Sequence, residues 1–424
     1  MAGLKILITS FMCAERSGLE VYVRDLALEL QKRGHVPIIY SPILGELAQK
    51  LRLKTIPVVD DLNAIGTFPD LIHGHHHMET MTALLHFPGV PAIYFCHNTF
   101  SGLDSPPASP RLLRYVAVDQ PCYEKLVFEH GVPAERARLL LNFVDGSRFK
   151  PRAPLPARPS RALIYGNYAR DDANLAAVRE ACSRAGMRLD VVGLGVGRPI
   201  TEPEKLLGQY DIVFAKARAA AEALTVGTAV VVYCMRSVGP MVTVSELERL
   251  LPLNFGIRTM TAHSSPESLT AAVSREIARY HPQDAAEVSR RVRDRLQSDK
   301  AIDGILSLYG EVIAEYRNAG APDPLAEARA AAAYIRWLSA RVRQQFDIVI
   351  DSPVVRPEEP LENEPVLGPP EELPESHPAV VRPKRLLARV SRNSTVIRLK
   401  RPLVRVPIVG KLAQSLVRRL VGSS

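Results

Sequence analysis

The sequence predicts an α/β protein with two domains, each a parallel sheet with helices on both faces. Short apolar runs alternate with helical patterns over residues 1–320, and a stretch rich in Pro, Arg and Ala, Asn142–Arg161, divides the pattern into two series. Alternating strands and helices are typical of βαβ units, whose strands pair in parallel. The chain has 424 residues, 46% of them hydrophobic, which suffices for two or three domains with sizeable cores.

The first series is expected to form a domain over residues 1–145. Leu4–Ile8 predicts a strand, after which apolar residues recur at helical spacing: Leu19, Tyr22, Val23, Leu26, Ala27 and Leu30. Gly34 ends that helix, and Val36–Tyr40 predicts the next strand. Further strands are expected at Thr55–Val59, Leu71–His73, Pro91–Phe95 and Tyr115–Val118, with helices at Met78–His86 and Tyr123–His130.

The second series is expected to form a domain over residues 160–320. Its predicted strands are Ala162–Tyr165, Arg188–Val192, Asp211–Phe214 and Ala229–Tyr233. Ser265 followed by Pro266 is a favourable helix start, because it combines an N-cap with Pro at the first helical position. Helices are expected at Pro266–Tyr280 and Ile302–Asn318. One more helix, Pro324–Phe346 within residues 322–347, carries the only tryptophan, Trp337.

The last part of the chain divides into two segments of opposite charge. Residues 349–378 contain eight prolines, eight acidic residues and one arginine, and predict a disordered linker. Residues 379–424 contain twelve Lys or Arg and no acid. In Lys411–Val421 the apolar residues share one helical face, which predicts an amphipathic helix at an anionic membrane surface. The alternatives are a disordered basic tail or a helix docked on the protein itself. Base-stacking aromatics are missing from this tail, so we expect no nucleic-acid partner.

The cysteines and the chain start indicate the compartment. Five cysteines are scattered through the sequence without metal-ligand spacing: Cys13, Cys96, Cys122, Cys182 and Cys234. This usage fits a reducing environment. The opening residues, MAGLKILITS, are expected to run into a strand and not to form a signal peptide. We therefore expect a cytoplasmic protein, peripheral at the membrane if the tail binds there.

The stretch Asp211–Tyr233 predicts an anion-binding site. It is expected to contain a strand, a short basic loop with Lys216 and Arg218, a helix that includes Glu222, and a second strand. A helix that starts directly after a strand presents free N–H groups and the positive end of its dipole. The two cations would face phosphates and Glu222 would accept from ribose hydroxyls, as a nucleotide-diphosphate ligand requires. The alternative is a surface loop with two solvated cations.

Five stretches, in order, resemble glycosyltransferase family 4, the retaining nucleotide-sugar transferases of GT-B fold. They are SGLEVYVRDLALELQKRGHVPIIY (Ser17–Tyr40), DLIHGHHHMETMTALL (Asp70–Leu85), PAIYFCHN (Pro91–Asn98), EKLVFEHGVPAERARLLLNFVDGSRFKP (Glu124–Pro151) and AEALTVGTAVVV (Ala221–Val232). The resemblance covers about residues 1–320. It implies two Rossmann-like domains, with the acceptor on the N-terminal side and the nucleotide-sugar on the C-terminal side. It also implies a glycosyl transfer with retention, without metal or other cofactor. The acceptor is expected to be a glycan or lipid-linked molecule, because the basic tail could hold the enzyme at a membrane.

The resemblance also implies roles for individual residues. The backbone of Gly18, at the start of the first helix, would approach the donor phosphate or the acceptor, where a Cβ would obstruct it. His97, at the end of a strand, would contact the sugar or acceptor and could position a hydroxyl or share a proton. Lys216 and Arg218 are expected to join it in catalysis because of their charge and position, and not because a motif matches. Glu222 matches the second of the family's two glutamates and would bind the donor.

Two departures from the family pattern affect the donor site. Phe214 stands where the first glutamate is expected, eight positions before Glu222. The family's Gly-Arg-x-x-x-x-Lys-Gly stretch is replaced by YGNYARDD, Tyr165–Asp172. Asn167 and Arg170 within this stretch are the expected donor-binding replacements. These losses leave open a non-catalytic nucleotide- or glycan-binding scaffold, and the fold leaves open a nucleotide-sugar epimerase.

Two further motifs suggest chemistry that we do not expect. The histidines His73, His75 and His77 would point one way on a strand, as metal ligands can, but no carboxylates accompany them. The glycines of Val191–Gly197 resemble a dinucleotide fingerprint, but Pro199 interrupts the helix that should follow. We expect neither a metal nor NAD.

Overall fold

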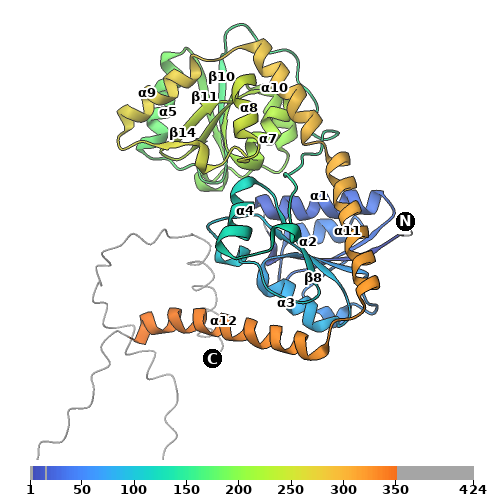
Figure 1. Cartoon of the computed structure of the whole chain (residues 1–424). Helices are drawn as coiled ribbons and strands as arrows, with labels where there is room; N and C mark the ends of the chain where they lie inside the picture. Colours follow the sequence, from blue (N-terminus) through green and yellow to red (C-terminus); the bar gives the residue numbers. More distant parts are fainter. Residues whose placement is uncertain (1–2, 15–16, 351–424) are drawn as a thin grey trace, which may run out of the picture. The chain divides into compact units, whose positions relative to one another are not determined.

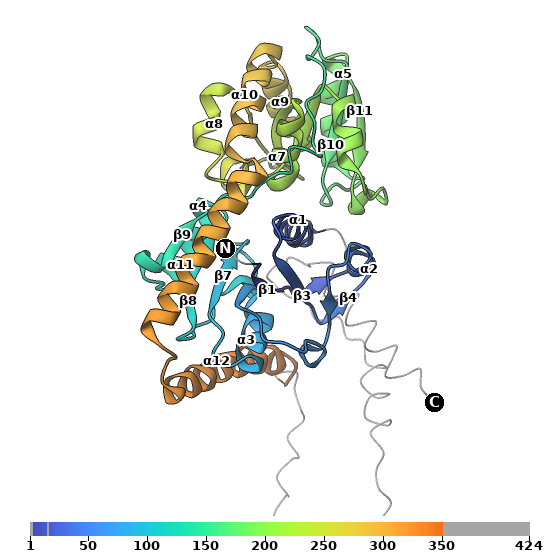
Figure 2. The ribbon, with the colours of Figure 1, turned by 90° about the vertical axis from the view of Figure 1, so that its right-hand side faces the viewer.

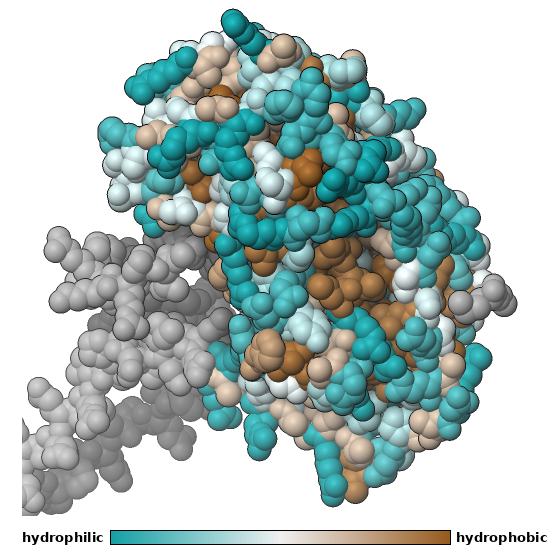
Figure 3. Space-filling model, turned by 45° about the horizontal axis from the view of Figure 1, so that its top comes forward, coloured by the Kyte–Doolittle hydropathy of each residue, from teal (hydrophilic) through white to brown (hydrophobic). Residues whose placement is uncertain are grey.

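The structure is a computed structural model that describes residues 3–14 and 17–350, with side chains up to residue 343. The predicted tail, residues 379–424, and all but the first two residues of the predicted linker, 349–378, lie outside the described residues. The described chain contains two large sheets, each covered by helices (Figure 1), and a small sheet of β2 (Met12–Cys13) and β4 (Ile43–Leu44). The predicted α/β fold with parallel sheets is thus confirmed. Figure 3 shows one face of the molecule, which is mostly polar with apolar residues gathered near its middle.

The first sheet has seven strands in the order β5-β3-β1-β6-β7-β8-β9, all paired in parallel. The strand order reverses between β1 and β6, and ligands of open α/β sheets bind at the carboxyl ends of the strands beside such a reversal. The strands are β1 (Lys5–Thr9), β3 (Val36–Tyr40), β5 (Val58–Val59), β6 (Leu71–His75), β7 (Ala92–Cys96), β8 (Leu112–Ala117) and β9 (Ala137–Leu139). The helices of this half are α1 (Gly18–Lys32), α2 (Glu46–Arg52), α3 (His77–His86) and α4 (Gln120–Glu124).

The second sheet has the order β11-β10-β12-β13-β14-β15, with a reversal between β10 and β12. Its strands are β10 (Arg161–Tyr165), β11 (Arg188–Val192), β12 (Ile212–Ala215), β13 (Ala229–Cys234), β14 (Ser237–Met241) and β15 (Thr261–Ala262). The first four in chain order pair in parallel, but β14 and β15 are antiparallel, which the sequence analysis did not predict. Only Met235 and Arg236 separate β13 from β14, and a parallel connection needs a dozen or more residues.

The helices of the second half were predicted less completely than its strands. They are α5 (Ala173–Arg184), α6 (Pro203–Leu206), α7 (Ala217–Val226), α8 (Val244–Leu250), α9 (Pro266–Ile277) and α10 (Pro282–Arg295). The sequence analysis did not locate α10, because its buried apolar side is narrow. Only Ala285, Val288 and Val292 supply it, within a segment rich in Arg and Asp.

The chain returns to the first core through α11 (Ser298–Ala319), as both ribbon views show (Figures 1 and 2). Its buried residues belong to the core of the first sheet: Ile302, Ile305, Leu308, Tyr309, Val312 and Ile313. The expected second domain, residues 160–320, therefore ends in a helix whose apolar side packs elsewhere. The periodicity that predicts a helix does not say which sheet it covers. The last described helix, α12 (Pro324–Ile350), lies beside α3.

Several histidines lie buried in the first half. The Nδ1 atom of His73, on β6, is 2.6 Å from the Tyr309 hydroxyl of α11, and the imidazole stacks on Phe95 with ring centroids 4.2 Å apart. Burial lowers the pKa of His73 and His75 well below the ordinary value and that of His76 and His77 to about 4. These imidazoles are therefore neutral in the folded protein near neutral pH.

Substitution Tyr309→Phe should lower the free energy of unfolding by about 1–3 kcal/mol, because it leaves a buried imidazole without its hydrogen bond. Among the described residues, His73 Nε2 has no other partner to compensate. Urea denaturation measures the change. The matched control is Tyr316→Phe on the same helix, whose buried hydroxyl has no hydrogen-bond partner in the described part of the chain. Equal losses for the two variants would contradict the role given to the Tyr309–His73 contact.

Stability should fall as the pH drops from about 6.5 towards 4.5. The unfolded histidines bind protons in this range while His76 and His77, with pKa values of about 4, stay neutral when folded. Each such group contributes up to roughly 1.4 kcal/mol per pH unit. Burial also raises the pKa of Asp104 to about 6 and of Glu79 to about 7, and these acids oppose the trend. The histidines outnumber them, so acid should destabilise the protein.

Chemical denaturation at several pH values tests this dependence. Substitution His77→Phe removes one proton-binding site of the unfolded state and keeps an aromatic ring beside Trp337, so it should flatten the slope. A free energy of unfolding that stays constant or rises on acidification would refute the assignment of neutral histidines.

Candidate functional site

The predicted site residues of the second half lie where β12 passes into α7. Lys216 is the N-cap of α7, Arg218 is in its first turn and Glu222 lies one turn further. Ala217 adopts a positive φ of 49°, a conformation that costs strain for a residue with a Cβ. The backbone therefore bends sharply at the start of α7, at the end of β12 that borders the reversal of strand order.

Glu222 is buried and both of its carboxylate oxygens have partners. The Tyr165 hydroxyl, at the carboxyl end of β10, donates to Oε2 at 2.7 Å, and Arg218 Nε donates to Oε1 at 2.9 Å. Burial and the adjacent Glu222 carboxylate hold the pKa of Tyr165 well above its ordinary value, so its hydroxyl stays protonated and can donate. The Glu222 carboxylate is thus held in one orientation by a residue at the end of β10 and by a residue of its own helix.

Arg218 links the two halves of the protein. Its Nη2 contacts the carboxylate of Asp25 on α1, while its Nε contacts Glu222. The sequence analysis expected Arg218 to face a diphosphate, but here two acids share its charge, because Glu222 lies four residues along the helix and Asp25 lies opposite. Within the described residues, the buried Nη1 atom of Arg218 has no hydrogen-bond partner. This leaves one N–H donor edge for a ligand.

One face of α1 points towards this network. Gly18, Tyr22 and Asp25 are spaced by four and three residues and therefore lie along the same side of the helix. Gly18 is exposed, and a Cβ built there meets nothing within 4 Å. The space beside Gly18 is open, although the described residues give no contact there that requires glycine.

His97 follows β7 and joins the network from the first half. Its Nε2 lies 3.0 Å from Nδ1 of His75, its backbone N–H donates to Asp104 at 2.9 Å, and its ring packs edge-on against Tyr22 with centroids 4.7 Å apart. Burial lowers the pKa of His97 to about 3, with further contributions from His76 and the Arg218 cation. His97 is neutral, so it can share a hydrogen bond but cannot act as a cationic acid near neutral pH.

Lys216 lies beside a second group of residues. Its ammonium is 5.4 Å from the centre of the Tyr168 ring, and the Tyr168 hydroxyl donates to the carbonyl of Tyr233 at 2.7 Å. Lys216 also lowers the pKa of Cys234, although burial raises the pKa of this thiol more strongly. The side chain is only partly buried and lies at the N-terminus of α7.

Asn167 and Arg170 lie in the loop after β10, where both are exposed. The side-chain oxygen of Asn167 accepts from the backbone N–H of Leu194 at 3.2 Å. Gly193 has φ of 144°, and a Cβ there would lie 2.1 Å from the carbonyl oxygen of Gly166. The glycines that resembled a dinucleotide fingerprint therefore allow this turn to pack against the loop of Asn167.

The structure thus brings His97, Arg218 and Glu222 together, and places Lys216 at the adjoining N-cap. Asn167, Arg170 and Gly18 lie on flanking segments. The sequence analysis missed three members of the network, Asp25, Tyr22 and Tyr165. A sequence signal existed for each: Asp25 and Tyr22 share a helical side with Gly18, and Tyr165 ends a predicted strand.

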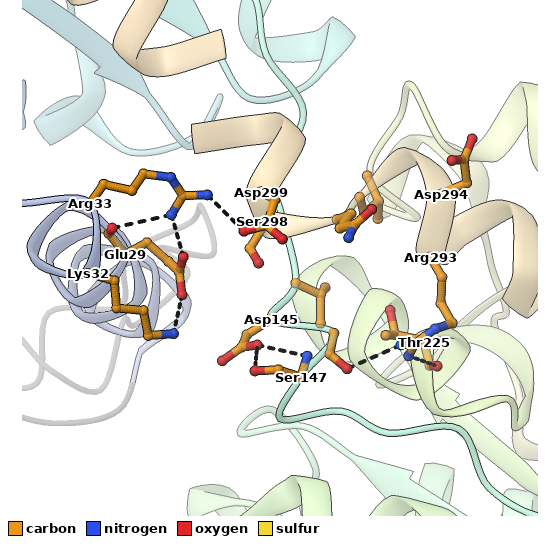
Figure 4. A pocket seen from close by; sticks show the side chains of 14 residues that line it. Glu29, Lys32, Arg33, Asp145, Ser147, Thr225, Arg293, Asp294, Ser298 and Asp299 are labelled. Carbon is orange, nitrogen blue, oxygen red and sulfur yellow. Dashed lines mark hydrogen bonds and ion pairs between the residues drawn. The ribbon is translucent and has the colours of Figure 1, made fainter. Parts of the chain in front are cut away.

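A cavity of about 600 Å³ lies away from this network (Figure 4). It is lined by the C-terminal ends of α1 and α7 and by the segments that connect the halves, with Arg33, Asp145, Thr225, Arg293 and Asp299 among its residues. Glu29 there accepts from Lys32 at 2.5 Å and from Arg33 at 2.6 Å. The helix C-termini lie at the amino ends of parallel strands, opposite to the ligand edge. We therefore assign the candidate site to the network and not to this cavity.

The described part of the chain contains neither a metal-binding cluster nor a membrane-spanning helix. No group of three or more His, Cys, Asp or Glu among these residues could hold a metal ion. None of the described helices is both long and apolar enough to cross a bilayer.

Comparisons with known proteins agree with this architecture. Residues 16–148 match the model of Glycosyltransferase Family 4, whereas a comparison with curated proteins found no match. A glycosyltransferase structure from Rickettsia africae has a TM-score of 0.51 at 12% identity, covering 73% of this chain and 99% of its own. Anabaena HepE in complex with UDP-glucose has a TM-score of 0.51 at 15% identity, covering 74% of this chain and 100% of its own.

At such identities the structural likeness establishes the fold, and the family match is confined to residues 16–148 of the 424-residue chain. The chain therefore has the GT-B fold, and its residues 16–148 are similar to glycosyltransferase family 4.

Proposed function

We propose that the protein transfers a sugar, with retention at the anomeric carbon, from a nucleotide-diphosphate donor to a glycan or lipid-linked acceptor. The observation that carries the proposal is the contact network of Arg218 with Glu222 and Asp25. It joins the carboxyl end of β12, where ligands of such sheets bind, to the side of α1 that carries Gly18 and Asp25. HepE binds UDP and UDP-glucose on the same fold, which supports a nucleotide-sugar as the donor.

The charges of the site suit a leaving diphosphate. Departure of the nucleotide builds negative charge on a phosphate oxygen, and preorganised cations and N–H donors stabilise that charge. Lys216 at the N-cap, the first N–H groups of α7 and the exposed Arg170 are available for this role. Arg218, held by two acids, is better suited to position Glu222 and to offer its remaining N–H edge.

Glu222 is assigned to the ribose hydroxyls. A carboxylate accepts from two adjacent hydroxyls, and Tyr165 and Arg218 fix its orientation before the ligand arrives. Asn167 in the neighbouring loop would contact the donor, and neutral His97 would hydrogen-bond the sugar or the acceptor. In this proposal no metal is required, because cations of the chain supply the positive potential.

The acceptor side rests on sequence features. We propose a cell-envelope or lipid-linked glycan, because the basic segment 379–424 would hold a cytoplasmic enzyme at an anionic membrane. A second candidate function is a non-catalytic binding protein. The observation that favours it is the pairing of Arg218 with two acids, which lowers the positive potential available to a diphosphate.

Substitution Glu222→Gln should remove selectivity for ribose. Calorimetry on the native protein with UDP, GDP and ADP would identify the nucleotide that binds. That nucleotide should bind roughly tenfold or more tightly than its 2′-deoxy form, because a hydrogen bond to a charged group contributes about 1.5–3 kcal/mol. In the variant the ratio should approach one. Glu267→Gln, at an exposed position of α9, is the control. An unchanged ratio in Glu222→Gln would contradict the ribose role, whereas absence of binding by the native protein would contradict the donor itself.

Release of nucleoside diphosphate from the matching nucleotide-sugar should require an acceptor, and Lys216→Met should slow it roughly a hundredfold. The matched control is Lys205→Met, an exposed lysine of the same half, which should react normally. The measurement is nucleotide release with and without glycan acceptors, and the anomeric configuration of the product by NMR. Interconversion of the nucleotide-sugar without release would indicate an epimerase. Binding without any reaction would support the non-catalytic alternative.

A further inference from the structure

We propose that the outward face of α12 is a docking surface for an anionic lipid bilayer. This surface consists of the apolar residues Leu325, Ala328, Ala332, Ile335 and Val342 and of three arginines, Arg329, Arg336 and Arg343. It is distinct from the basic segment 379–424 and does not depend on the transfer reaction.

The opposite side of α12 is fixed to the first half. The Tyr334 hydroxyl is 2.8 Å from Nδ1 of His77, and the rings of Trp337 and His77 pack edge-on with centroids 4.9 Å apart. Near the start of the helix, Glu327 pairs with buried Arg111 at 2.9 Å. These contacts lie on one side of α12 and determine which residues point outward.

The outward side combines exposed apolar residues with regularly spaced cations. Ile335 is 58% exposed, Leu325 53% and Val342 41%, which is unusual for three large aliphatic residues of one helix face. Arg329, Arg336 and Arg343 are seven residues apart, so they form a row along the helix with a spacing of about 10.5 Å. An apolar stripe bordered by arginines is the pattern of a helix that lies in a membrane interface.

Exposed aromatic residues lie on segments next to α12. Phe100 and Phe128 are 78% and 76% exposed. Their segments are tied together, because Lys125 Nζ donates to the carbonyls of Asn98 and Ser101, and a Cβ built on Gly102 would lie 3.2 Å from Nη1 of Arg341 on α12. Aromatic side chains are enriched at membrane interfaces, where they extend the apolar area available for lipid contact.

The charge pattern favours a bilayer over other occupants. A second copy that packed on this face in a parallel arrangement would set the arginine row against its own counterpart, which is repulsive. Nucleic acid would leave the aliphatic stripe without a partner. In a bilayer, anionic headgroups pair with the arginines while the aliphatic side chains enter the acyl boundary. A bilayer therefore provides partners for both the apolar residues and the arginines of this surface.

A fluorophore attached to the outward face tests the proposal in the full chain. All five native cysteines are buried, so Ile335→Cys can be labelled selectively with an environment-sensitive NBD group. Emission should rise and shift to the blue with phosphatidylcholine vesicles that contain phosphatidylglycerol, and should not change with pure phosphatidylcholine. The matched control is Ile257→Cys, 47% exposed on the second half, which should remain in water.

The arginine row is tested in the labelled protein by replacing Arg329, Arg336 and Arg343 with Gln. Apparent affinity for the anionic vesicles, read from the label, should fall roughly fivefold for each arginine removed. A label that stays in water while the protein co-sediments with vesicles would assign membrane binding to another segment and overturn the proposal. A response that depends on protein concentration without lipid would assign the face to self-association and also overturn it.

Discussion

The contact of Arg218 with Asp25 and Glu222 is the interaction on which the candidate site depends. It joins α7 of the second sheet to α1 of the first, and it does so with charges that are largely withdrawn from water. Burial of a guanidinium costs free energy unless carboxylates lie beside it. Removal of any one of the three side chains would therefore leave an uncompensated buried charge. Tyr165 extends the network to the end of β10, and Tyr22 and His97 extend it to the first sheet. The candidate donor and acceptor sides therefore share one set of hydrogen bonds and ring contacts.

The ion pairs of Arg218 affect which cations of the site can contact a phosphate. A free arginine at a helix N-terminus would be a phosphate ligand, whereas an arginine between two acids mainly orients them. Lys216, which lies over the Tyr168 ring at the N-cap, and the exposed Arg170 are the better candidates for contact with a phosphate. The neutral histidines of β6 and β7 have a parallel role. His75 contacts Nε2 of His97, which fixes the orientation of the His97 ring.

The sequence was sufficient for the order of most parallel strands and for placing several candidate residues at the ends of these strands. Parallel strands with buried Val and Ile runs, such as β12 and β13, were found because their apolar runs are uninterrupted. The antiparallel β14 and the narrow apolar side of α10 were missed, because a short hairpin and three apolar residues give weak signals. Glu222 was located by its motif, but Asp25, which shares Arg218 with it, lies 193 positions before that arginine. No local sequence pattern predicts such a contact, because it forms only when both sheets are folded.

The return of α11 to the first sheet has a consequence for synthesis on the ribosome. The hydrophobic core begun by β1 is completed by Ile302, Leu308 and Tyr309, which are translated after every strand of the second sheet. While the intervening residues emerge, the cleft that α11 later fills exposes His73 and its apolar neighbours to solvent. The N-terminal half therefore stays incompletely packed until α11 is synthesised, whereas the second sheet can fold before that. This order is the reverse of the usual one, in which the N-terminal domain folds first.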